Sequence, residues 1–87
     1  ASCWFQLGTA QSKLEDFPSA AHAFERAIEL DEQYAVAWFN LGGAHLNAGH
    51  LHSAAQAWGE AVRRFPEHKL VSVVRADYDW LVGAASE

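Results

Sequence analysis

The sequence has little of what several protein classes require. A single cysteine, Cys3, excludes an internal disulfide and a cysteine-rich metal site. It is compatible with a reducing compartment, which favours an intracellular, cytoplasmic location. Only six residues are Lys or Arg against eleven Asp or Glu, so the clustered basic residues that bind nucleic-acid phosphates are missing. No apolar run approaches the roughly 20 residues of a membrane-spanning helix. These absences leave a small acidic domain with no expected nucleic-acid partner and no membrane span.

The abundant residues favour helices. Of the 87 residues 51% are apolar, too many for a disordered chain, and the length allows one domain. Seventeen residues are Ala, the strongest helix former, and the alternating β-branched pattern of strands is missing. Pro18 suits the first turn of a helix, Pro66 breaks the chain, and Gly49 is placed to end a helix. These breakers predict five helical stretches, at about 2–14, 18–30, 35–48, 51–64 and 67–82.

The chain repeats itself with an offset of 34 residues. The positions that coincide are Trp4 with Trp38, Phe5 with Phe39, Leu7 with Leu41, Gly8 with Gly42, Ala20 with Ala54, Phe24 with Trp58, and Ala27 with Ala61. The first helix of each copy carries Trp, Leu and Gly on one face, and the second carries a small-large-small stripe. The glycine lets a large side chain of the partner helix sit over it. Neither helix can bury its stripe alone, so the folding unit is a helical hairpin.

These residues resemble the tetratricopeptide repeat family, whose 34-residue unit carries Trp, Leu-Gly, Tyr, Ala, Phe, Ala and Pro at fixed positions. The resemblance covers about residues 1–68. Trp58 stands for the Phe in the second copy and Pro66 matches the final Pro. Gln11 and His45 stand where the family has Tyr.

The resemblance implies an all-α fold, an α-α superhelix (solenoid) of five antiparallel helices in a single domain. We expect one repeat over 1–34, a second over 35–68, and a C-terminal capping helix over 69–87. Alternatively, the last segment is the first helix of a degenerate third repeat. The cap is favoured because the residues after 82 offer no second helix.

The resemblance also implies protein–protein recognition, in a concave groove lined by the first helices of successive repeats. Carried over by repeat position, the groove residues are Phe5, Thr9, Val36, Phe39, Asn40, Gly43, Leu46, Asn47, Val73, Asp77 and Trp80. This set predicts a strongly apolar, nearly uncharged groove with anchors at Phe5, Phe39, Leu46, Val73 and Trp80. Such a groove suits an extended peptide or an amphipathic helix of a partner protein. Alternatively, the repeated aromatic residues Phe5 and Phe39 simply fill the space between first helices.

The outer side of the first helix suggests a different, structural function. Cys3, Ala10 and Leu14 form a mildly apolar edge there. A preceding repeat would cover this edge in a longer array, and a second copy would cover it in a homo-oligomer. The alternative function is therefore self-association, or membership of a longer array, without a separate ligand.

Catalytic and metal sites are not expected. The five histidines are His22, His45, His50, His52 and His68. No cysteine or close carboxylate completes a zinc shell around them, so we expect no metal and no cofactor. A zinc-binding or pH-sensing histidine site is the remaining alternative. The chain lacks a phosphate-binding glycine loop, a nucleophile elbow and a zinc-protease motif, so no catalytic residue is predicted and the protein is not expected to be an enzyme.

Overall fold

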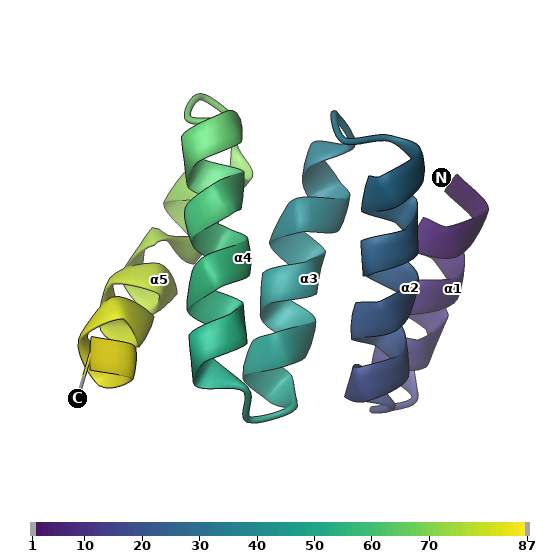
Figure 1. Ribbon diagram of the computed structural model, residues 1–87, viewed down its shortest axis with the longest axis horizontal. Coiled ribbons are helices and arrows are strands. Elements are labelled where there is room, and N and C mark those ends of the chain that lie inside the picture. The colour runs from purple at the N-terminus through teal and green to yellow at the C-terminus, as the bar shows by residue number, and fades with distance from the viewer. Residues whose placement is uncertain (1, 87) are drawn as a thin grey trace.

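Five helices form the fold in the computed structural model, which describes residues 2–86 (Figure 1). They are α1 (Ser2–Lys13), α2 (Phe17–Leu30), α3 (Ala35–Asn47), α4 (Leu51–Arg64) and α5 (Leu70–Ser86), and the described residues contain no strand. Consecutive helices run antiparallel, with α3 at the centre and α1 and α5 at the two ends. The expected all-α superhelix is confirmed. Within the described chain no helix is both long enough and apolar enough to cross a membrane.

The turns after α1 and α3 end their helices in the same way. Glu15 and Gly49, which are one repeat apart, both have positive φ, 63° and 84°. In each turn the following N–H bonds back five residues, from Asp16 at 2.9 Å and from His50 at 2.8 Å. This is the Schellman ending of a helix. The expected role of Gly49 is confirmed, whereas Glu15 takes the same left-handed conformation without the freedom of a glycine.

The last helix differs from its expected bounds at both ends. It begins at Leu70, three residues later than expected, and continues beyond residue 82 to Ser86. The Leu70 N–H donates a hydrogen bond to His68 Nδ1 at 3.1 Å, which satisfies one of the free donors of the first turn. His68 therefore fixes the start of α5.

The two glycines of the repeat lie beneath aromatic rings. A Cβ atom on Gly8 would lie 2.7 Å from Cε1 of Phe24, and one on Gly42 would overlap the indole of Trp58. Both rings are buried, and Trp58 Nε1 donates a hydrogen bond to the Phe39 carbonyl at 2.8 Å. The packing of a large side chain over a small one, expected from the repeat, is present in both hairpins.

Packing joins helices that follow one another in the chain. α1 packs on α2, α2 on α3, α3 on α4, and α4 on α5, while the contact between α3 and α5 is much smaller. Each interior helix is thus held on two sides, and each end helix chiefly on one.

Candidate functional site

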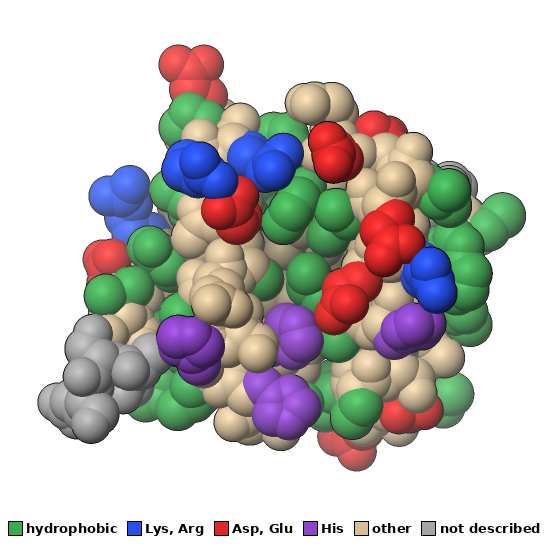
Figure 2. Space-filling view, viewed as in Figure 1, with side chains coloured by type: hydrophobic (Ala, Val, Ile, Leu, Met, Phe, Trp, Pro, Cys, Tyr) green, Lys and Arg blue, Asp and Glu red, His purple; other side chains and the backbone are tan. Residues whose placement is uncertain are grey.

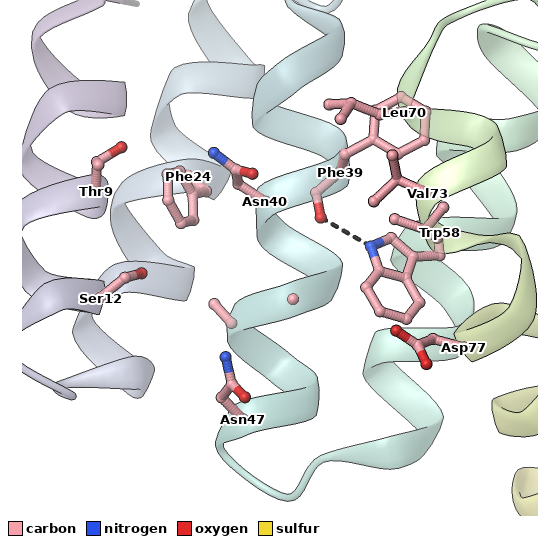
Figure 3. A pocket seen from close by; sticks show the side chains of 13 residues that line it. Thr9, Ser12, Phe24, Phe39, Asn40, Asn47, Trp58, Leu70, Val73 and Asp77 are labelled. Atoms are coloured by element: carbon pink, nitrogen blue, oxygen red, sulfur yellow. Dashed lines mark hydrogen bonds between the residues drawn. The ribbon is translucent and has the colours of Figure 1, made fainter.

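A hollow of about 390 Å³ opens on the side of the molecule where α1, α3 and α5 lie, and we call it the groove (Figure 3). The residues that line it are Thr9, Ser12, Phe24, Phe39, Asn40, Gly43, Ala44, Asn47, Trp58, Leu70, Val73, Val74 and Asp77. α3 forms its centre, with α1 on one side and α5 on the other. The first helices of both hairpins and the final helix therefore share one concave surface.

Seven of the eleven residues predicted from repeat position line the groove. These are Thr9, Phe39, Asn40, Gly43, Asn47, Val73 and Asp77. The other four, Phe5, Val36, Leu46 and Trp80, do not line it. The residues selected by repeat position and the residues that line the groove therefore overlap only in part.

Two of the expected anchors are packed in the interior. Phe5 contacts Phe24 and Tyr34, with ring centroids 5.6 and 5.1 Å apart. Phe39 is 3% exposed, and its ring stacks on His68 at 5.2 Å. This packing fits the alternative role of both rings, in which they fill the space beside their own helices, although Phe39 also lines the groove.

The remaining residues outside the groove have separate environments. Leu46 is half-buried against the cluster around Trp58, and Val36 is half-buried on α3. Trp80 is 60% exposed on α5. Of the five expected anchors only Val73 lines the groove and is exposed, so the surface is less apolar than predicted.

Sequence reasoning missed the two rings that reach the groove from the second helices. Phe24 comes from α2 and Trp58 from α4. The signal was present, because each ring packs against a repeat glycine of the adjoining first helix, although both rings are almost fully buried. Repeat positions taken from the first helices alone do not include these two rings.

Polar side chains with unused hydrogen-bonding groups occupy the centre of the groove. Asn40 and Asn47 lie seven residues apart on one face of α3, and Ser12 faces them from α1 (Figure 3). None of these three side chains has a hydrogen-bond partner among residues 2–86, whereas Thr9 Oγ1 donates to the Phe5 carbonyl at 3.0 Å. The amides of Asn40 and Asn47 are therefore free to bind a ligand.

Gly43 leaves an opening between the two amides. A Cβ atom at this position would meet nothing within 4 Å. The α3 backbone is therefore accessible from the groove between Asn40 and Asn47, and a ligand backbone has room to approach it closely.

The groove is nearly uncharged, as predicted. Asp77 is the one ionisable residue among those that line it. Other charges gather on the face presented by α2 and α4 (Figure 2). There Glu60 pairs with Arg63 and Arg64, and hydrogen bonds from these two guanidinium groups lower the pKa of the Glu60 carboxyl.

His45 lies in a second hollow, on that opposite face, together with Trp38 and Glu25. Its Nε2 is 3.8 Å from Glu25 Oε1, and its Nδ1 is buried without a partner. Burial lowers the pKa of His45, and nearby His50 lowers it further, while Glu25 opposes the shift. Within residues 2–86 no three side chains of the His, Cys, Asp or Glu types lie close enough to hold a metal ion.

His45 predicts a loss of stability in mild acid. Because folded His45 binds its proton less tightly than the unfolded residue does, its contribution is complete above about pH 6.5 and declines as the pH falls below it. We expect His45→Gln, which copies Gln11 of the first hairpin, to reduce the difference in urea midpoint between about pH 7.5 and about pH 5.5. The exposed His52→Gln variant is the control. An unchanged pH dependence in His45→Gln would contradict this prediction.

Antiparallel hairpins stacked side by side, with a groove along their first helices, define an α-helical repeat protein. The sequence model of the tetratricopeptide repeat family matches residues 5–69, and the chain belongs to this family. Proteins of the family are generally non-catalytic scaffolds for protein–protein interaction.

Two curated relatives carry the same repeat. A TPR repeat-containing protein of Pseudomonas aeruginosa is 34% identical over 64 residues, which are 74% of this chain and 61% of that protein. The tetratricopeptide repeat-containing protein trd-1 of Caenorhabditis elegans is 31% identical over 65 residues, 75% of this chain and 8% of that protein. The chain thus matches less than two thirds of the length of either relative.

Proposed function

We propose that the groove binds an extended segment of a partner protein and that the chain has no catalytic role. The observation that carries this proposal is the pair of unpaired amides, Asn40 and Asn47, on either side of the open Gly43. Residues 1–34 and 35–68 would act as the two repeats, and α5 as a cap that also supplies one side of the groove.

The free amides favour an extended segment over a helix. A carboxamide offers both a donor and an acceptor, which match the N–H and C=O groups of a peptide unit. A helix uses these groups within itself, but an extended segment leaves them available. Asn40 and Asn47 are separated by about 10 Å along α3, which corresponds to roughly three residues of an extended chain. One peptide lying along α3 can therefore reach both amides.

The double variant Asn40→Ala/Asn47→Ala is expected to weaken peptide binding by about 5- to 150-fold, because each lost amide removes net hydrogen bonding of roughly 0.5–1.5 kcal/mol. The probes are peptides selected on the unchanged chain from a phage-displayed library of random linear sequences. Binding is measured by fluorescence anisotropy with labelled synthetic peptides.

Gln56→Ala serves as the control, because Gln56 is an exposed amide on the opposite face. Its variant should bind like the unchanged chain. The proposal is overturned if selection yields no peptide, or if every selected peptide binds the double variant as tightly as the unchanged chain. A peptide that becomes helical on binding would contradict the extended mode.

We also propose a second function, self-association through the outer face of α1. What we call the α1 stripe consists of Cys3, Leu7 and Ala10 of α1 and of Leu14, the first residue after it. Leu7 is 45% exposed, whereas Leu41, its equivalent on α3, is 7% exposed because α2 covers it. The same face of a first helix is thus buried in one hairpin and open in the other.

The α1 stripe complements itself in an antiparallel pair. A two-fold axis between positions 8 and 9 places Leu14 opposite Cys3 of a second copy and Leu7 opposite Ala10. A large side chain then meets a small one at every level, as in the hairpins themselves. Lys13 is the one charged residue of α1, so the pairing opposes no like charges.

Leu7→Glu is expected to abolish self-association, because it places a charge at the centre of the paired α1 stripes. Sedimentation equilibrium over a concentration series measures the effect, and Leu30→Glu, at the exposed end of α2, is the control.

The variant Leu14→Cys tests the register of the pair. With oxidised glutathione it should form a dimer linked by a disulfide between position 14 of one copy and Cys3 of the other, since the two positions lie too far apart within one chain. If the unchanged chain stays monomeric throughout the concentration series, this second function is refuted.

A further inference from the structure

We infer that the groove selects a segment carrying an apolar and a basic side chain two positions apart, recognised by Val73 and Asp77 of α5. This inference rests on the proposed function, because it assigns side-chain specificity to the peptide whose backbone Asn40 and Asn47 would hold. The partner is thus defined by its chemistry, as an extended, locally basic and apolar stretch of protein.

The spacing of Val73 and Asp77 matches that of an extended peptide. Both residues line the groove from α5 (Figure 3). They are four residues apart on one helix face, a rise of about 6 Å. In an extended chain, residues i and i+2 point to the same side and lie about 6.6–6.8 Å apart. Two side chains on one side of the peptide can therefore meet Val73 and Asp77 together.

Asp77 supplies an unmatched negative charge. Its carboxylate has no ion pair and no hydrogen bond within residues 2–86, and no basic side chain lines the groove. Trp58 and Val73 line the same part of the groove, so a bound peptide would enclose the carboxylate between its own atoms and apolar ones. Reduced access of water strengthens attraction to a Lys or Arg and penalises an Asp or Glu at the same position.

Val73 supplies the apolar half of the site. It is exposed although it is a large hydrophobic residue, and Leu70 lies half-buried one turn before it. An apolar ligand side chain placed here removes both surfaces from water. The aliphatic stem of the neighbouring Lys or Arg can pack on the exposed surface of Val73 while its charge reaches Asp77.

The test is peptide selection from the same random library, run in parallel on the unchanged chain, Asp77→Lys and Asp79→Lys. Asp79 is exposed on α5 and does not line the groove, so its variant makes the same charge change as a matched control. The unchanged chain and Asp79→Lys should both enrich Lys or Arg two positions from an apolar residue. Asp77→Lys should enrich Asp or Glu at that position.

One selected peptide is then resynthesised with its basic residue changed to Glu. We expect its affinity for the unchanged chain to fall at least about tenfold and its affinity for Asp77→Lys to rise. Peptides that show no basic preference, or that bind Asp77→Lys as well as the unchanged chain, overturn this inference but leave the binding function intact. Recovery of no peptide by any of the three proteins overturns both.

Discussion

Gly42→Ala is expected to lower the free energy of unfolding by about 2–4 kcal/mol. The added Cβ would overlap the Trp58 indole, which must then turn away. Turning breaks the hydrogen bond from Trp58 Nε1 to the Phe39 carbonyl, 2.8 Å long and buried. Overpacking and a lost buried hydrogen bond therefore act together.

Gly43→Ala is the matched control, one residue further along the same helix. The new methyl group enters open space, so the variant should gain about 0.5–1 kcal/mol from the better helix propensity of Ala. Urea unfolding followed by circular dichroism measures both variants. Equal midpoints would show that contact with Trp58 does not govern Gly42. If the proposed function is correct, Gly43→Ala also weakens peptide binding, because it narrows the opening between the amides.

Phe39→Ala should cost about 3–5 kcal/mol, the usual range for truncating a buried aromatic residue. Its ring is almost fully buried and stacks on His68, the residue that caps α5. Typical stabilities of 0.05–0.15 kcal/mol per residue give roughly 4–13 kcal/mol for a chain of this length. The variant should therefore lose a large part of the stability of the domain.

Leu30→Ala provides the comparison, because Leu30 is large and apolar but exposed at the end of α2. The unfolding midpoint of Leu30→Ala should change little. Thermal and urea unfolding of Leu30→Ala and Phe39→Ala measure the two costs. A cost for Phe39→Ala as small as that for Leu30→Ala would show that position 39 is not part of the core. Because Phe39→Ala is expected to destabilise the whole fold, loss of binding in this variant would not identify a contact.

The fold could be predicted because its information is local and repeated. Gly8 packs against Phe24 and Gly42 against Trp58, and the number of residues between glycine and ring is the same in both pairs. Gly49 could be assigned to a helix end because left-handed backbone favours glycine. Glu15 could not be assigned in this way, since its residue type gives no sign of a positive φ.

The groove could be predicted only in part. Repeat phase selected Asn40, Asn47 and Asp77, which line the groove, but it could not show that Phe39 is almost fully buried. Neighbours on a helix point about 100° apart, so a small rotation decides whether a ring faces the groove or the adjoining helix. Phe39 lies in one buried cluster with Val71, Val74 and Leu81 of α5, and α5 carries no clear copy of the repeat.

Because each helix packs chiefly on the helices before and after it in the chain, the width of the groove can vary. The sides of the groove are α1 and α5, the two end helices, whereas its centre is α3, which is held on both sides. In repeat proteins the ends open more easily than the middle, so the width of the groove can fluctuate while α3 remains folded. A segment in contact with both end helices would restrain them. Amide hydrogen exchange would then slow most in α1 and α5, and less in α3, which carries the residues proposed to bind the backbone of the segment.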